Sequence, residues 1–150
     1  MNSSYNIPIK MVAEYFLSKV DADAGDCISN LKMQKLVYYA QGFVLAITSK
    51  KLFNEDIIAW QHGPVVPELY ESYKQFSASC IPVPERIDIK SILENSDLVE
   101  ILNDVYNVYG QFSAWKLRNM THEELPWKEV EINDTIKSTT MKKYFKTLLV

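Results

Sequence analysis

The two histidines of the chain are the residues best suited to acid–base chemistry. His62 lies in the run Trp-Gln-His-Gly-Pro, and His122 lies in the run Thr-His-Glu-Glu-Leu-Pro-Trp. An imidazole near a carboxylate such as Glu124 is a common acid–base pair in enzymes. However, Thr121 and Glu124 also match the Thr-x-x-Glu capping box of a helix start. We favour a structural role for these side chains and keep a small enzyme with a His62/His122/Glu124 pocket as an alternative.

The sequence contains no spacing typical of metal or phosphate ligands. Neither histidine has a second ligand four residues away, and there is no Cys-x-x-Cys pair, Walker motif or Gly-x-Gly-x-x-Gly loop. Zinc sites and nucleotide-binding loops depend on such spacings. We therefore expect no metal and no cofactor.

Composition indicates one soluble domain without a membrane or nucleic-acid partner. The 150 residues are 47% apolar and carry a net charge of −3, which does not suit a nonspecific nucleic-acid binder. We see no signal-peptide pattern and no apolar run near the roughly 18 residues that span a bilayer. Cys27 and Cys80 do not form the dense framework of a secreted domain, so we interpret them as reduced thiols in a cytoplasmic protein.

Hydrophobic spacing predicts a mainly α fold, a single compact helical domain of about six to seven helices. The first predicted helices are 7–20, 30–50 and one that begins at Pro64 or Pro67 and ends near 76. Ser96 is predicted to cap a helix that stops at Gly110, Ser113 one from 114 to about 120, and Ser138 one that reaches 149, with a turn or short helix from 126. Residues 56–60 are predicted to be extended. Ile87 and Ile89 could pair with Ile57 and Ile58 in a small two-stranded β hairpin.

The helix predicted after Ser29 combines an apolar stripe with several long polar side chains. The stripe consists of Leu36, Tyr39, Ala40, Phe43 and Val44. Lys32 and Lys35 lie in the first turns, where a cation opposes the helix macrodipole. The simplest interpretation is a solvated face, and the alternative is a polar and aromatic contact surface for a protein partner.

The three tryptophans are candidates for either the core or an interface, because tryptophan is frequent in both. We predict that Trp60, which follows two isoleucines and an alanine, belongs to the core. Trp115 and Trp127 have polar neighbours, so both alternatives stay open for them.

Three blocks of the sequence together resemble the Panacea antitoxin domain, a family that includes SocA-like and phage-associated GepA-like proteins. The blocks are residues 28–42, 52–70 and 121–127, in that order and at family-like spacing. The resemblance extends from about residue 9 to about residue 145. It identifies residues 1–150 as a single Panacea-like antitoxin domain.

The resemblance implies a mostly helical antitoxin, not an enzyme, that neutralises a cognate protein toxin by direct binding. The toxin is expected to be encoded next to it, and the resemblance does not indicate which toxin it is. An alternative is a proteolytic adaptor that delivers the toxin to a protease. Homo-oligomer formation also stays open.

The family motifs supply the candidate residues for toxin binding. By position they are Lys32, Gln34, Lys35, Tyr39, Gln41, Trp60, His62, Gly63, Pro64, His122, Glu124, Pro126 and Trp127. If Lys35 lies on an exposed working surface, Lys35→Glu should weaken neutralisation and leave the melting temperature nearly unchanged.

Overall fold

The computed structural model describes residues 3–149 and is mainly α-helical, as predicted. In this range it has eight α-helices, two short 3₁₀ helices and a three-stranded sheet. The α-helices are α1 (Ile9–Leu17), α2 (Asn30–Thr48), α3 (Pro67–Tyr73), α4 (Lys90–Leu93), α5 (Ser96–Tyr109), α6 (Ala114–His122), α7 (Leu125–Lys128) and α8 (Ser138–Lys146). The 3₁₀ helices are η1 (Ala22–Ala24) and η2 (Lys74–Phe76).

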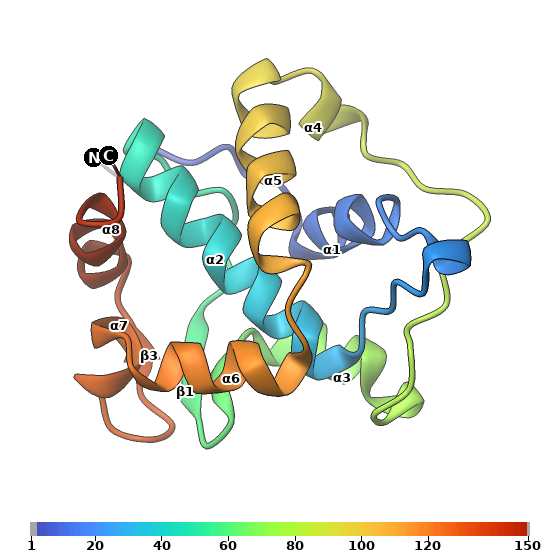
Figure 1. Cartoon of the computed structure of the whole chain (residues 1–150). Helices are drawn as coiled ribbons and strands as arrows, with labels where there is room; N and C mark the ends of the chain where they lie inside the picture. Colours follow the sequence, from blue (N-terminus) through green and yellow to red (C-terminus); the bar gives the residue numbers. More distant parts are fainter. Residues whose placement is uncertain (1–2, 150) are drawn as a thin grey trace.

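Helix α2 runs through the middle of the molecule, and α5, α6 and α8 pack around it (Figure 1). It begins where the sequence predicts, because the Ser29 hydroxyl accepts the backbone N–H of Lys32 at 3.3 Å. It ends at Thr48, followed by Ser49 in the left-handed conformation. A helix that is covered on several faces buries more than its apolar stripe, so some of its polar side chains are buried as well.

Only some of the other helices begin at the predicted residue. Pro67 is the first residue of α3, and Ser113 caps α6 through the backbone N–H of Lys116. Ser96 and Ser138 are first helical residues rather than caps, since Asn95 and Lys137 precede α5 and α8. The sequence pattern therefore places the helices well and their first residues less well.

The sheet has the order β2-β1-β3, with all neighbours antiparallel. Its strands are β1 (Ile57–Trp60), β2 (Gly63–Val65) and β3 (Thr135–Ile136). The predicted pairing of β1 with Ile87 and Ile89 is wrong. Gly63, at φ 110°, allows the chain to turn straight back after Trp60, so β2 takes one edge of β1 and the distant β3 takes the other. Pro64 lies on the edge strand β2, where a proline is tolerated.

Helix α8 lies close to α2 because α2 has a glycine at the contact. A Cβ atom at Gly42 would collide with the Phe145 ring. The same ring packs edge-on against Tyr38, with ring centroids 5.4 Å apart. Tyr38, Tyr39 and Phe145 are all fully buried, so this aromatic contact is part of the core.

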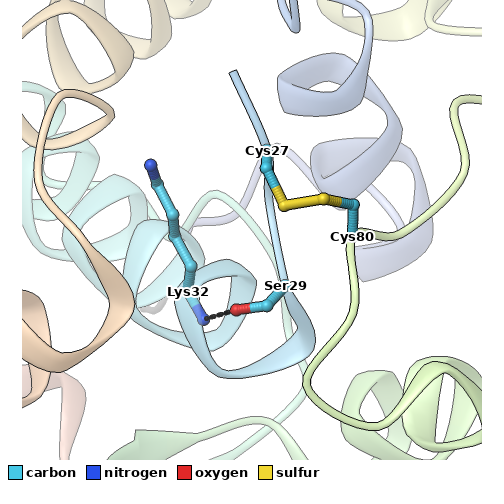
Figure 2. Close-up of a disulfide and its surroundings, with 4 residues drawn as sticks. All are labelled: Cys27, Ser29, Lys32 and Cys80. Carbon is cyan, nitrogen blue, oxygen red and sulfur yellow. Dashed lines mark hydrogen bonds between the residues drawn. A yellow bond between two sulfur atoms is a disulfide. The ribbon is translucent and has the colours of Figure 1, made fainter. Parts of the chain in front are cut away.

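Cys27 and Cys80 form a disulfide, so the reduced-thiol interpretation is wrong (Figure 2). The two residues are 53 positions apart, and their spacing gives no sign of the bond. Folding brings the segment after η2 beside the start of α2, where the Ile81 N–H donates to the Ile28 carbonyl at 2.8 Å. The disulfide also removes one of the two arguments for a cytoplasmic location.

Candidate functional site

Four of the five candidate residues on α2 lie inside the protein. The exposed fractions are 1% for Gln34, 0% for Lys35 and 3% for Gln41, and Tyr39 is buried as well. The expectation that these side chains are exposed is therefore wrong, and their part in toxin binding stays a prediction. Each of these side chains finds an internal hydrogen-bond partner, and this is what allows a polar group to be buried.

Gln34 and Gln41 connect α2 to neighbouring backbone segments. The Gln34 Oε1 accepts the Val66 N–H at 2.9 Å, just before α3. The Gln41 amide makes three bonds to the segment before β1. Its Oε1 accepts the N–H groups of Leu52 at 2.7 Å and Phe53 at 3.4 Å, and its Nε2 donates to the Phe53 carbonyl at 2.7 Å. These amides satisfy backbone groups that no helix or strand pairs, so they hold the chain around α2.

Lys35 connects α2 to the hairpin of β1 and β2. Its Nζ donates to the Pro64 carbonyl at 3.1 Å. Gly63 makes room for it, because a Cβ there would lie 2.6 Å from the Lys35 Cε and 2.8 Å from the Thr121 Oγ1. Within residues 3–149, no carboxylate is at ion-pair distance from Lys35. Burial, with a smaller contribution from Arg118, lowers the pKa of Lys35 to about 7.

Glu124 connects the third motif block to α2. Its two carboxylate oxygens accept the hydroxyl protons of Tyr38 at 3.0 Å and Tyr39 at 2.9 Å. The predicted capping box is wrong, since the Thr121 hydroxyl donates to the Arg118 carbonyl within α6. Burial raises the pKa of Glu124 to about 7, although both tyrosine hydrogen bonds oppose this shift. Burial and the nearby Glu124 raise the pKa of both tyrosines.

His122 and Trp127 form a stacked pair beside β1. Their ring centroids are 3.9 Å apart with an interplanar angle of 7°. The Trp127 indole N–H donates to the Trp60 carbonyl at 2.9 Å, which joins α7 to the sheet. Burial, followed by the charge of Arg118, lowers the pKa of His122, and a hydrogen bond with the Gln61 backbone opposes this. Pro126, at the start of α7, is buried.

His62 has a different environment from His122, because it is exposed at the tip of the hairpin. It lines a cleft of about 520 Å³ between the start of α2, the hairpin and η2. Trp60, only half-buried against Tyr70, forms another part of the lining. Neither His122 nor Glu124 reaches this cleft, so the three residues of the alternative enzyme pocket do not share it.

Lys32 is the one lysine of the first block that keeps some exposure. Its Nζ donates to the Gly110 carbonyl at 2.6 Å, at the end of α5. Figure 2 shows its side chain extending from the first turn of α2, close to the disulfide. Burial lowers its pKa, and the charge of Asp26 opposes that shift.

The three motif blocks thus meet around the first half of α2, but as a connected internal network. The list of candidate binding residues lacks four residues that complete the network or lie beside it: Asn30, Tyr38, Thr121 and Arg118. Asn30 donates to the Tyr70 carbonyl and accepts from Gln34. A signal for Asn30 is present, since it stands four residues before Gln34 on the same helix face. Thr121 opens the third motif block, whereas no such signal marks Arg118.

Two features are absent from residues 3–149. No group of three or more His, Cys, Asp or Glu side chains is arranged to hold a metal ion. In the same range, every helix is too short or too polar to cross a bilayer.

Comparison with known proteins agrees with the motif blocks. Residues 33–128 match the family described as "Antitoxin SocA-like, Panacea domain". The protein named "Antitoxin SocA" from Caulobacter vibrioides (strain NA1000 / CB15N) is 39% identical over 134 residues, which is 81% of this chain and 69% of that protein. No solved structure matches the chain. The chain therefore belongs to the SocA-like Panacea-domain antitoxin family.

Proposed function

We propose that this protein is an antitoxin that neutralises a cognate protein toxin by binding to it directly, without catalysis of its own. Membership of the antitoxin family supports the biological role. The observation that carries the mechanism is the burial of Lys35 and Glu124 within a closed hydrogen-bond network.

Burial matters because a catalytic group has to reach its substrate. Lys35 contacts the Pro64 carbonyl, and Glu124 contacts two tyrosine hydroxyls, so both groups are engaged inside the fold. The exposed His62 stands in a cleft that neither of them lines. Among these residues the geometry offers no convergent nucleophile, acid and base, and it favours action through surface binding.

Co-expression with the product of the adjacent gene tests the proposal. We expect the neighbouring protein to stop growth when it is expressed alone, and growth to return when this chain is co-expressed. The two purified proteins should elute together in size-exclusion chromatography. A neighbour that is harmless alone, or that stays toxic beside this protein, would contradict the proposal.

The same cells distinguish masking from delivery to a protease. For masking, the toxin's half-life is unchanged or longer when the antitoxin is present. For an adaptor, the half-life falls, and it recovers in a protease-deficient strain. The second result would replace direct neutralisation with proteolytic delivery.

A further inference from the structure

We propose that the exposed face of α6, together with the tip of the hairpin, is the surface that binds the toxin, and that it receives an acidic region of that protein. We call this surface the α6 ridge and define it as His62, Trp115, Lys116 and Arg118. The inference rests on the proposed antitoxin function and specifies where and how the partner is bound.

The α6 ridge combines aromatic and cationic side chains, of which Arg118 and His62 lie next to Trp115. Trp115 is 56% exposed, which is unusual for a side chain of this size. The Arg118 guanidinium lies 4.6 Å from the centre of the Trp115 ring, and the His62 ring lies 6.1 Å from it. Lys116 is exposed and lies 5.9 Å from the Phe112 ring. Tryptophan and arginine are the residues most enriched at binding hot spots.

The cations of the ridge have no acidic partner in the described part of the chain. The one ion pair found there joins Lys74 to Glu71, both outside the ridge. Helix α6 itself contains no Asp or Glu. Among residues 3–149 the buried Nε of Arg118 has no hydrogen-bond partner, and its Nη1 donates to Asn119 at 2.9 Å. A carboxylate from a partner would complement this charge, which stands out on a chain of net charge −3.

The cleft beside the ridge gives a partner a concave place to insert a side chain. His62 belongs to both features, and the cleft wall includes the apolar side chains of Ile132 and Val65. Hot spots are strongest where an anchor enters a pocket that excludes water. A protein partner fits this combination better than a nucleic acid, because phosphate recognition depends on many basic contacts rather than on a few cations and an apolar cleft.

The buried network supplies the rigidity that such a surface needs. Thr121 and Leu117 fasten α6 to the interior, and Lys35 holds the hairpin through the Pro64 carbonyl. The aromatic and cationic groups are thereby presented on fixed elements, which reduces the entropy lost on binding.

Two variants with matched controls test the inference, using the purified product of the adjacent gene as the probe. Trp115→Ala removes the exposed ring, and Leu93→Ala removes an equally exposed side chain (58%) on α4. Lys116→Glu reverses a charge on the ridge, and Lys90→Glu reverses an exposed charge on α4. Figure 1 places α4 and α6 at opposite ends of the molecule.

We expect each ridge variant to weaken toxin binding by about tenfold or more, while each control stays within about twofold of the unchanged protein. The effect of Lys116→Glu should shrink as salt is raised, because screening weakens the attraction between charges. Melting temperatures should be unchanged for both charge variants. If Trp115→Ala does not fold, the pair of charge variants decides the question alone.

Three outcomes would overturn the inference in distinguishable ways. If the ridge variants bind the toxin as well as their controls do, the ridge is not the docking surface, although the antitoxin function stands. If the unchanged chain does not bind the toxin at all, the proposed function fails first. If labelled duplex DNA or RNA binds and loses affinity with Lys116→Glu while toxin binding is retained, the ridge is a nucleic-acid surface instead.

Discussion

Two regions of the molecule contain long polar side chains in opposite environments. The first is a set of buried residues on and beside α2, and the second is the outer face of α6. We call the first region the buried polar seam and define it as Gln34, Lys35, Gln41 and Glu124. The α6 ridge likewise combines long polar side chains with aromatic rings, yet it faces solvent. The difference is in the partners. The seam bonds to backbone and hydroxyl groups of its own chain, whereas the ridge cations pair with no carboxylate of residues 3–149.

This contrast teaches that residues shared with a family are not necessarily the residues that touch its partner. Here the family-like lysine and glutamines connect α2 to the hairpin, to α3 and to the segment before β1. Substituting them would damage the fold, so a loss of binding would say little about contact. Surface variants are the ones that can separate recognition from folding.

The largest expected difference between the two regions comes from reversing one charge in each. Lys35→Glu would place a carboxylate against the Pro64 carbonyl without a donor, and we expect a loss of about 3–5 kcal/mol in the free energy of unfolding. Lys116→Glu should change it by no more than about 0.5 kcal/mol. Urea titration measures both. Lys35→Met, which keeps most of the side-chain volume, is the control. If Lys35→Glu unfolds at the same urea concentration as the protein without substitutions, Lys35 is not enclosed by the fold.

Reduction of the disulfide should loosen the connection between the start of α2 and the rim of the cleft. The bond joins residues 53 positions apart, so its removal should cost about 2–4 kcal/mol. Calorimetry with and without a dithiol reductant measures the shift in melting temperature. The variant with Cys27→Ser and Cys80→Ser should melt at the same temperature in both conditions. If the protein without substitutions melts at the same temperature before and after reduction, although two free thiols are counted after it, the bond adds no stability.

Gly63→Ala should lower the free energy of unfolding, because the added Cβ would collide with residues beside the seam and strain the backbone. The added Cβ would meet Lys35 and Thr121, and φ 110° is unfavourable for alanine, so we expect a loss of at least about 1–3 kcal/mol. Gly25 is a matched control, with φ 86° and no atom of residues 3–149 within 4 Å of the place that a Cβ would take. Chemical denaturation of the two variants separates backbone strain from collision. Equal losses would show that close contact with Lys35 contributes nothing.

The last expected effect is a stability minimum near neutral pH to which Glu124 and Lys35 of the seam contribute. Folding raises the pKa of Glu124 from 4.5 to about 7, so the folded state binds more protons in that window and stability falls as pH rises through it. Folding lowers the pKa of Lys35 from 10.5 to about 7, so stability rises again as pH increases above 7.

Unfolding free energies measured from about pH 5 to about pH 9 test this pH dependence. Glu124→Gln should flatten the acidic side of the curve, and Lys35→Met should flatten the alkaline side. Lys116→Glu serves as the control and should leave the minimum in place. A minimum that survives both seam variants would assign it to other groups.

Local pattern was sufficient for those features that depend on neighbours along the chain. The start of α2 after the capping residue Ser29 follows from capping preferences, and backbone preferences limit the start of α3 to Pro64 or Pro67. The partner of β1 was predicted wrongly, because one of its two neighbours, β3, comes from residues 135–136. No local property of residues 57–60 could indicate a strand so far away.

By itself, the sequence determined the helical class, the approximate positions of the long helices and the family to which the chain belongs. Only the tertiary structure decided that Lys35 and the two glutamines are internal, that Cys27 meets Cys80, and that Trp115 stands exposed beside His62. The reason is physical. Helix periodicity depends on residues three or four positions apart, whereas burial of a polar group depends on a partner that can come from anywhere in the chain.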